Sequence, residues 1–504
     1  MLLIFPRWTV DDAYITYRYA ENFAWHGQLT WNLDEDPVEG YTGIALPVIL
    51  AFFIKMGFEP SLISHLIGIT GLFGTGMLLY FLMGRLAVTG LARALIIFIF
   101  FSSPFLYKNA FSGLESLLFS LFISASLYNF DISLKVEKNY RSDLSLMILL
   151  VLTGLTRPEG VVLAGLIICA LGYIRYRESF HKLWPFVVKA GIFYFIPALI
   201  YFLWRWHYYG QFLPNTYYAK LHNGLIALRT LKDLIIFFLD CLFLPTLGVI
   251  LLFGAGYRRN LISVKEYIKN MIAGKSAMVY AVAVSFTLIS FLKYLKTELM
   301  MNFSHRFFVP FYPVFLILFG SLLMVGIKNW QQSPKLSQKR ILRPLIVILC
   351  IVFLINNYFQ LKNEINTTVA YRQLLAEVHI PAGIYLKETI PPDEWLSVYI
   401  DAGAIPYYAG LKTIDFGKLN DEALATGNFS QRELADYFFS KKPAAAVFTS
   451  SAWDSLDNSR RAHDITKDGR FASYRLVKKY RCKAVKNYFE FIYLRNDLID
   501  ENMK

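Results

Sequence analysis

Two adjacent carboxylates, Asp11 and Asp12, open a polar segment close to the start of the chain. If this segment is helical, residues at successive steps of three, four and four lie on one face: Asp11, Tyr14, Arg18 and Asn22. A face that carries a carboxylate, a phenol, a guanidinium and an amide can form a single polar site. A solvated helix start with acidic residues in its first turn has the same pattern. These residues alone therefore leave both interpretations open.

The composition places these carboxylates in a membrane protein. The chain has 504 residues, of which 56% are hydrophobic, 17% aromatic and only 17% charged, and its mean hydropathy is +0.41. Soluble globular proteins are more charged and less apolar. The apolar residues form runs close to the ~20 residues that a membrane-spanning helix needs: 60–83, 91–107, 113–130, 160–174, 186–204, 234–254, 276–295, 306–327 and 341–359. Because lipid cannot hydrogen-bond the backbone, we predict an α-helical polytopic membrane domain over residues 1–360 with about ten spans.

The net charge of +14 comes largely from short loops between the apolar runs. The basic residues of three such loops are Arg175, Arg177, Lys182, Arg258, Arg259, Lys265, Lys269, Lys275, Lys328, Lys335, Lys339, Arg340 and Arg343. Cytoplasmic loops are enriched in Lys and Arg, so we assign these loops to the cytoplasm. The loops at 205–233 and 296–306 and the residues after about 360 then lie outside. We expect no nucleic-acid partner, because the basic residues do not form one soluble face.

This orientation makes two further demands on the chain. Residues 144–174 must cross the membrane twice, as two short helices that break near Arg157 and Pro158, since proline disfavours a continuous helix. Residues 43–56 must not cross, so we predict a helix that lies in the interface or re-enters the membrane. The residues before Asp11 are too few to span. We expect either that a first helix of the bundle is missing from this sequence or that its N-terminus lies on the outer surface.

From residue 361 the chain becomes polar and alternates short β-rich runs with helical patterns. The expected strands are 395–400, 444–449, 474–480 and 489–494, and the expected helices are 367–377 and 430–440. We predict an extracytoplasmic α/β domain over residues 361–504. Of the four cysteines, only Cys482 lies in this domain, so neither a disulfide framework nor a cysteine-based metal site is indicated.

Polar and ionisable residues gather at the predicted outer ends of the spans. They are Glu35, Asp36, Glu39, Glu115, Arg157, Glu159, Asn215, Tyr217, Tyr218, Lys220, His305 and Arg306. Ionisable groups at membrane depth are costly and tend to be functional. Each also has an ordinary explanation, such as snorkelling for Lys220 and Arg306 or helix capping for Glu159. Their accumulation on one side of the bilayer predicts a site in the outer leaflet.

The chemistry that suits this set of residues is transfer of a group from a lipid phosphate. A carboxylate can take the proton from an attacking hydroxyl. We assign this base to Asp11, because it shares a helix face with Tyr14 and Arg18. Asp12 points ~100° away and could hold the acceptor, a metal ion or the loop itself.

Cations hold the phosphate and stabilise its charge as it leaves. We assign the donor phosphate to Arg306, Lys220, Arg157 and His305. We assign further substrate contacts to Tyr14, Arg18, Glu39, Tyr41, Glu115, Asn215 and Tyr218. We expect no required cofactor, and an optional divalent cation would bind oxygen ligands from Asp12, Glu39 and Glu115.

A series of motifs along the chain also resembles one enzyme family. The motifs are residues 10–22, 27–32, 38–42, 112–115, 156–160, 213–220, 305–307 and 401–408, with Asp415, Asn420 and Asp421. In order and content they resemble the bacterial cell-wall arabinofuranosyltransferase-like group of GT-C membrane glycosyltransferases. The resemblance implies an inverting enzyme that uses a polyprenyl-phosphate sugar, with a catalytic carboxylate from the acidic pair and interfacial helices in the external loop 9–59. Members of this group place a full transmembrane helix before the acidic pair, where this sequence has ten residues.

These expectations combine into one function. We expect a hexosyl- or pentosyltransferase that moves a sugar from a polyprenyl-phosphate carrier to a cell-envelope glycan, lipid or protein acceptor. We place it in the bacterial cytoplasmic membrane, with the site and the C-terminal domain outside. Asp401, Tyr407 and Tyr408 would contact the acceptor, although buried tyrosines in a plain strand-to-helix turn fit the same residues. A polymerase or ligase of lipid-linked glycans and a lipid or solute transporter are the alternatives.

Overall fold

The computed structural model describes residues 1, 3–135, 140–220, 227–254, 274–297, 299–332, 336–456 and 465–499. The chain forms two compact units. The helical unit comprises Met1–Phe5, His65–Leu203 and Leu221–Glu364, and the mixed unit comprises Pro6–Ser64, Trp204–Lys220 and Ile365–Lys504. Both units are therefore assembled from segments that lie far apart in the sequence.

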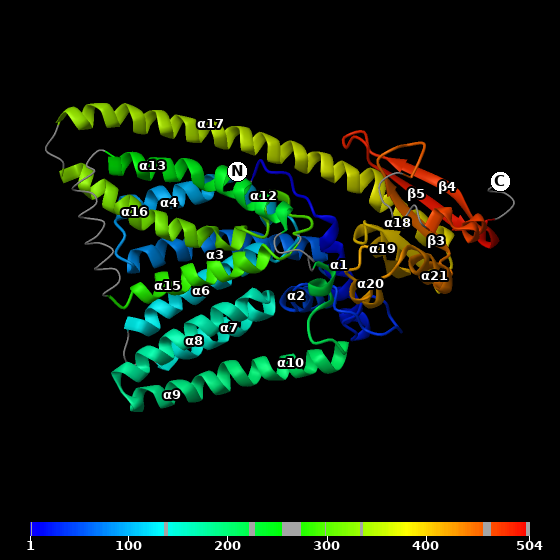
Figure 1. Cartoon of the computed structure of the whole chain (residues 1–504), viewed down its shortest axis with the longest axis horizontal. Coiled ribbons are helices and arrows are strands. Elements are labelled where there is room, and N and C mark those ends of the chain that lie inside the picture. The colour runs from blue at the N-terminus through cyan, green and yellow to red at the C-terminus, as the bar shows by residue number, and fades with distance from the viewer. Residues whose placement is uncertain are drawn as a thin grey trace. The chain divides into compact units, whose positions relative to one another are not determined.

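The helical unit is built mainly from apolar helices (Figure 1). Its helices, some of which end in the mixed unit, are α3 (Pro60–Arg85), α4 (Gly90–Ser102), α5 (Pro104–Ala110), α6 (Ser116–Lys135), α7 (Tyr140–Thr156), α8 (Glu159–Glu178), α9 (Phe180–Ala190), η1 (Gly191–Phe195), α10 (Ile196–Tyr209), α12 (Leu228–Phe237), η2 (Phe238–Leu242), α13 (Phe243–Gly254), α15 (Ala277–Tyr294), η3 (Phe303–His305), η4 (Val309–Phe311), α16 (Tyr312–Gln332) and α17 (Leu336–Leu374).

Within the described residues, eight helical segments are long and apolar enough to cross a membrane. The pair α4 and α5, bent by 58°, makes a ninth if it forms one span. The expected number of about ten is reached only if α7, which is shorter than the others, also crosses. The chain is a multi-pass membrane protein, as predicted.

The predicted break within residues 144–174 is present. Helix α7 ends at Thr156 and α8 begins at Glu159, so the interruption falls on Arg157 and Pro158. The two helices pack against each other. Several basic residues used to assign the orientation, in the ranges 255–273 and 333–335, lie outside the described residues.

The first part of the mixed unit is helical. Helix α1 (Asp11–His26) has both aspartates in its first turn and ends at Gly27, which has a φ of 71°. Helix α2 (Ala45–Lys55) packs against α1 and confirms a short helix within residues 43–56. A third short helix, α11 (Asn215–Lys220), follows the end of α10.

The second part of the mixed unit contains a five-stranded sheet with the order β2-β1-β3-β5-β4. The strands are β1 (Trp395–Tyr399), β2 (Lys412–Asp415), β3 (Ala445–Ser450), β4 (Tyr474–Arg481) and β5 (Phe489–Arg495). Strand β1 is parallel to β2 and β3, and β5 is antiparallel to β3 and β4. All four predicted strands are present, and β2 was not predicted. The central strand β3 is buried throughout, which explains why its first four residues, 445–448, are all apolar.

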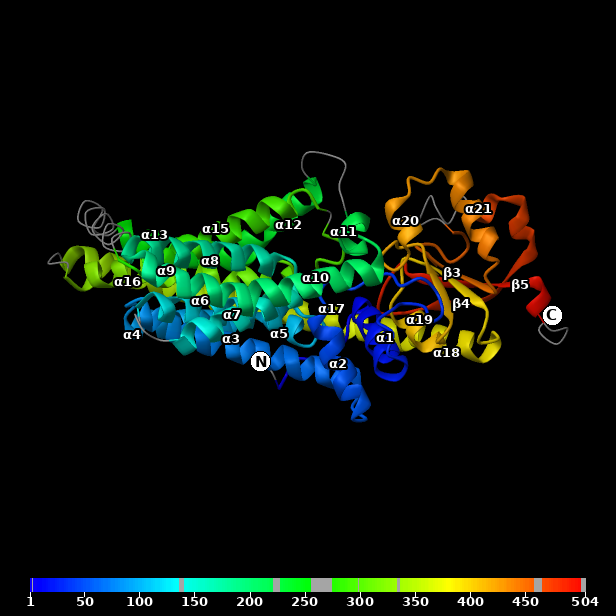
Figure 2. The same cartoon turned by 90° about the horizontal axis from the view of Figure 1, so that it is seen from below.

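Helices cover both faces of this sheet, as Figure 2 shows. Helices α18 (Ile380–Thr389) and α19 (Ala404–Ala409) share one apolar core with the strands, and α20 (Glu422–Thr426) and α21 (Gln431–Lys441) share the other. The remaining short elements are η5 (Leu375–His379), η6 (Gly469–Ser473) and η7 (Asn496–Leu498). The composition change at residue 361 is not a break in secondary structure, because α17 runs through it to Leu374.

Candidate functional site

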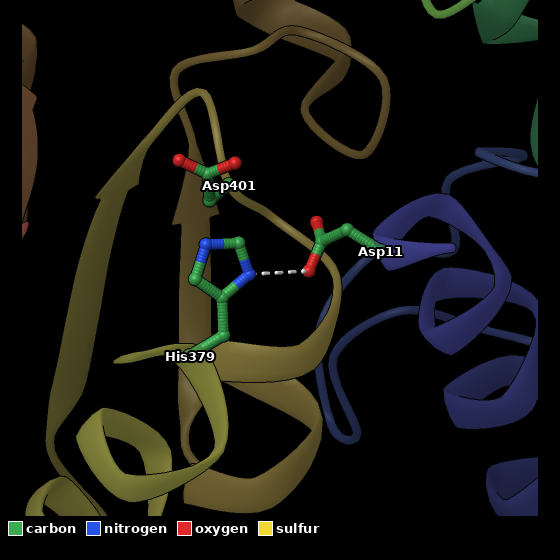
Figure 3. A group of neighbouring side chains, drawn as sticks. All are labelled: Asp11, His379 and Asp401. Atoms are coloured by element: carbon green, nitrogen blue, oxygen red, sulfur yellow. Dashed lines mark hydrogen bonds and ion pairs between the residues drawn. The ribbon is translucent and has the colours of Figure 1, made fainter. Parts of the chain in front are cut away.

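Asp11, the first residue of α1, is hydrogen-bonded to the start of α19. Its side chain is almost completely buried. The Oδ2 atom accepts a hydrogen bond from the Gly403 N–H at 2.9 Å, and Oδ1 accepts one from the Ala404 N–H at 2.8 Å. Oδ1 also lies 3.2 Å from His379 Nδ1 (Figure 3). Hydrogen bonds to a charged acceptor contribute about 1.5–3 kcal/mol each, so these contacts hold the beginning of α1 against α19.

Gly403 is required for this contact. A Cβ atom at residue 403 would overlap the backbone carbonyl of Asp11 and would also crowd its carboxylate. Only glycine allows the two backbones to approach so closely. The glycine in the motif at 401–408 therefore serves the packing of α19 on α1.

Asp12 occupies the next position of α1, ~100° around the helix from Asp11. Its side chain is partly exposed, whereas that of Asp11 is buried. Of the two adjacent carboxylates, Asp12 is thus the one whose side chain has exposed surface that a substrate could contact. The structure gives the two carboxylates different surroundings, Asp11 buried and Asp12 partly exposed.

The predicted polar face of α1 exists, and its groups bind other parts of the mixed unit. Arg18 donates hydrogen bonds to the carbonyl oxygens of Trp31 at 2.8 Å and Leu411 at 2.7 Å. Burial lowers the pKa of Arg18 to about 10, so it remains charged at neutral pH. The Tyr14 ring lies 5.3 Å from that of Tyr407. Both Tyr14 and Arg18, predicted to contact substrate, hold the protein together here.

Glu39 forms a buried ion pair that the sequence did not reveal. Its Oε2 accepts a hydrogen bond from Arg205 Nε at 2.7 Å, and both side chains are buried. Burial raises the pKa of Glu39 to about 7, against the opposing effect of Arg205. Tyr41 lies in the same region, with its hydroxyl 3.0 Å from that of Tyr209. These contacts tie the first loop to the end of α10.

Asn215 makes a similar connection from α11. Its Nδ2 donates to the carbonyl oxygens of Lys418 at 3.0 Å and Leu419 at 2.9 Å, and its side chain is buried. Tyr218 and Lys220, in the same helix, are partly exposed. In the motif at 213–220, Asn215 therefore has a packing role, whereas the side chains of Tyr218 and Lys220 are partly exposed.

A second group of predicted residues comes together in the helical unit. Arg157, 3% exposed, lies between two carboxylates: its Nη1 is 3.2 Å from Glu115 Oε1 and its Nε is 3.4 Å from Glu159 Oε2. Lys293 Nζ is 3.4 Å from Glu159 Oε1. The pairing of Glu115 with Arg157 was not foreseen, although both residues were assigned to the substrate.

Arg306 belongs to the same group. The Arg306 guanidinium lies 4.7 Å and that of Arg157 5.4 Å from the centroid of the Phe307 ring, so both contact one aromatic side chain. We name Arg157, Lys293 and Arg306, with Glu115 and Glu159, the basic cluster. It contains three basic side chains and two carboxylates.

The backbone beside Arg306 is strained. Ser304 and His305 have φ values of 43° and 59°, which residues other than glycine rarely adopt. The Ser304 carbonyl accepts a hydrogen bond from Asn109 Nδ2 at 2.9 Å, and its hydroxyl donates to Glu364. His305 Nε2 lies 3.2 Å from Asp240 Oδ2. Strain of this kind costs about 1–3 kcal/mol per residue and clusters at functional sites.

Sequence reasoning missed several residues of these groups. Arg205, Lys293 and His379 were not singled out because each lies next to or within an apolar run and meets its partner only after folding. For His379 one signal was present, since an imidazole in an otherwise apolar stretch needs a polar partner. Asp401, predicted to contact the acceptor, accepts hydrogen bonds from Thr449 Oγ1 at 2.7 Å and the Tyr488 hydroxyl at 2.5 Å.

Comparison with known proteins identifies the fold of the chain. Residues 364–493 match a family model described as a domain of unknown function, DUF8728. A search of curated protein sequences finds no match. The structure is similar to that of ArnT from Cupriavidus metallidurans in the apo state, with a TM-score of 0.56 at 13% identity over 99% of this chain and 95% of ArnT. The fold is that of the GT-C membrane glycosyltransferases.

Two further structures share the GT-C fold. ArnT bound to undecaprenyl phosphate matches with a TM-score of 0.55 at 14% identity, over 98% of this chain and 95% of ArnT. The apo oligosaccharyltransferase from Archaeoglobus fulgidus matches with a TM-score of 0.50 at 13% identity, over 95% of this chain and 77% of that enzyme. The GT-C fold predicted from the sequence motifs is confirmed, including its helical membrane part and its small C-terminal sheet domain.

Proposed function

We propose that this chain is an inverting glycosyltransferase that moves a sugar from a polyprenyl-phosphate carrier to a cell-envelope glycan, lipid or protein. The observation that carries the proposal is the GT-C fold over nearly the whole chain, shared with an ArnT structure that contains undecaprenyl phosphate. The basic cluster supports it, because four of its five residues, all except Lys293, lie in segments that the motifs single out.

We assign the general base to Asp12. A base must reach the hydroxyl proton that it removes, and both carboxylate oxygens of Asp11 are occupied by backbone N–H groups inside the mixed unit. Asp11 would instead fix the first turn of α1 and thereby the direction of Asp12. This assignment reverses the sequence-based preference within the acidic pair.

We assign the donor phosphate to the basic cluster. Its three basic side chains, Arg157, Lys293 and Arg306, suit a phosphate that gains negative charge as the sugar departs. Arginine guanidinium groups bind phosphate oxygens with directed hydrogen bonds. The strained backbone at His305 would keep the neighbouring Arg306 in a fixed orientation. Lys220, in the mixed unit, remains a further candidate for the phosphate.

The reaction belongs on the extracytoplasmic face of the bacterial cytoplasmic membrane. Nucleotide sugars are not present there, so the activated sugar has to arrive on a lipid. The sheet domain, described over residues 365–456 and 465–499, would contribute to acceptor binding. Tyr407 and Tyr408 are only partly buried against Tyr14, which leaves aromatic surface for a sugar ring.

The test is a donor assay with the purified full-length protein in lipid nanodiscs. Synthetic polyprenyl phosphates that carry different pentoses and hexoses are supplied with a cell-envelope extract as the source of the acceptor, and release of free polyprenyl phosphate is measured by mass spectrometry. The matched control supplies the same sugars as nucleotide derivatives. We expect release from at least one lipid donor and none from the nucleotide sugars.

Other outcomes would overturn the proposal and identify an alternative. Movement of the intact lipid-linked sugar across the bilayer without cleavage would indicate a transporter. Transfer of whole lipid-linked glycans with no use of single-sugar donors would indicate a polymerase or ligase. Cleavage of nucleotide sugars would contradict the lipid-donor mechanism.

A further inference from the structure

Three side chains of the mixed unit meet at a buried point: Asp11, His379 and Asp401 (Figure 3). They come from the start of α1, the end of η5 and the loop after β1. One ligand atom from each lies within 4.8 Å of the other two. The side chains of Asp11 and His379 are 6% and 2% exposed. The point lies inside the mixed unit and is separate from the basic cluster.

A fourth carboxyl group borders this point. Glu490, on β5, is fully buried and within hydrogen-bonding distance of Asp401. Its Oε1 shares two donors with Asp401 Oδ2, the hydroxyls of Thr449 and Tyr488. Its Oε2 has no hydrogen-bond partner among the described residues. We name Asp11, His379, Asp401 and Glu490 the acidic cluster.

The acidic cluster has fewer hydrogen-bond donors than its carboxyl groups and imidazole can accept. Thr449 and Tyr488 each carry one hydroxyl hydrogen, and both hydroxyls face the same two carboxyl groups. The short contact of 2.5 Å directs the Tyr488 hydrogen to Asp401, so the Tyr488 oxygen accepts from His379 Nε2, 2.9 Å away. With its proton on Nε2, His379 turns the lone pair of Nδ1 toward Asp11 Oδ1 at 3.2 Å. A cation between these two lone pairs, either a second proton on the imidazole or a metal ion, would satisfy both.

The cluster also has too little positive charge. It buries three carboxyl groups, and within the described residues His379 is the only basic side chain that pairs with any of them. Buried carboxylates without paired cations are strongly unfavourable. A divalent cation supplies the missing charge and occupies the unused lone pairs at once.

We propose that Asp11, His379 and Asp401 bind a zinc-class divalent cation, with Glu490 beside it. One imidazole nitrogen and two or three carboxylate oxygens form a ligand set that suits zinc better than magnesium or calcium, which prefer oxygen alone. Tyr488 holds the second ring nitrogen of His379, an arrangement that is typical of metal-bound histidines. The ion joins three segments of the mixed unit and is a structural ion that holds the first turn of α1 in place.

The site differs from the optional cation expected on Asp12, Glu39 and Glu115. Glu39 is paired with Arg205 and Glu115 with Arg157, so their carboxylates already have cationic partners. The acidic cluster has none apart from its own imidazole. The proposal does not depend on the transferase activity, because it concerns a ligand set within one unit.

The experiment measures metal binding and stability in the purified full-length protein. The protein is stripped with chelator, titrated with zinc chloride, and analysed by elemental mass spectrometry and thermal unfolding. We expect one zinc ion per chain and a higher melting temperature with zinc. His379→Gln and Asp401→Asn should each weaken binding by at least about 100-fold, since each removes a direct ligand, whereas Glu490→Gln should weaken it by about 10–100-fold.

Asp415→Asn is the matched control, because Asp415 is a buried aspartate of the same sheet domain outside the cluster. It should bind zinc like the wild type. Should His379→Gln not fold, Asp401→Asn with cobalt as a spectroscopic probe provides the same comparison. Unchanged melting and no retained zinc in the wild type would overturn the proposal, and would mean that Asp401 and Glu490 share a proton instead. Equal zinc binding by wild type and His379→Gln would overturn it as well.

Discussion

The acidic cluster of the mixed unit and the basic cluster of the helical unit are built from similar residue types in opposite proportions. The acidic cluster has three carboxyl groups and one imidazole, and the basic cluster has three cations and two carboxylates. Each is buried or half-buried, so its charged groups need partners. This difference underlies the two ligands that we propose, a cation for the acidic cluster and an anion for the basic cluster.

The comparison also separates packing from chemistry within the sequence motifs. In the mixed unit, the motif residues Arg18, Glu39 and Asn215 bind the backbone or side chains of other motifs. In the helical unit, Arg157 and Arg306 both contact the ring of Phe307. Motif residues that look catalytic in the sequence can therefore serve to pack the segments of a site against each other.

The largest expected effect on stability comes from breaking the basic cluster. Arg157→Met leaves Glu115 and Glu159 without their shared cation in a buried setting. Breaking a buried ion pair typically costs about 3–5 kcal/mol of unfolding free energy, so the melting temperature in detergent should fall markedly. Lys182→Met, at an exposed lysine of the same unit, is the control and should have little effect. A wild-type melting temperature for Arg157→Met would show that the cluster is not a tightly coupled group.

A pH prediction sharpens the account of the mixed unit, because Asp415 is a buried carboxyl without a basic partner among the described residues. Burial raises its pKa to about 6 from 3.8, although Asn420 and Gly417 donate hydrogen bonds to it. A raised pKa favours the folded protein below about pH 3.8, and this contribution of about 3 kcal/mol is lost as the pH rises through 6.

The measurement compares melting temperatures of the wild type and Asp415→Asn from pH 4 to 7. The wild type should lose stability relative to the variant over this range, because the amide does not ionise. Parallel curves for the two proteins would contradict the assignment.

A smaller effect is expected on donor use when the basic cluster loses one phosphate ligand. Arg306→Gln should lower kcat/KM for the lipid donor by about 10–100-fold, which corresponds to one charged hydrogen bond of about 1.5–3 kcal/mol. Arg306→Lys keeps the charge and should lose less. Measured with the donor assay, equal activity of wild type and Arg306→Gln would remove Arg306 from the phosphate site.

Much of the fold could be predicted from local patterns. The break at Arg157 and Pro158, the strands β1 and β3 and the short helix α2 each follow from residues within one segment. Strand β2 was not predicted, because four residues are too few to show a strand pattern. It is a strand because it pairs with β1.

The site was less predictable, because its contacts join distant segments. Asp11 and His379 are 368 residues apart in the sequence, and no local pattern states that they meet. The acidic pair was found from residue type and spacing, but the choice between its two members depended on Gly403 and Ala404, which contribute only backbone N–H groups. A sequence pattern does not show which side chain receives such bonds.

The central claim is that Asp12 carries the chemistry while Asp11 holds the helix that presents it. The most direct test compares Asp12→Asn and Asp11→Asn in the donor assay and by thermal unfolding, with Asp36→Asn, an exposed carboxylate of the same loop, as control. Loss of a general base lowers turnover by about 10²–10⁴-fold. We predict this loss for Asp12→Asn at an unchanged melting temperature, and a lowered melting temperature for Asp11→Asn. Normal turnover in Asp12→Asn, with lost turnover in an Asp11→Asn protein that melts like the wild type, would contradict the account.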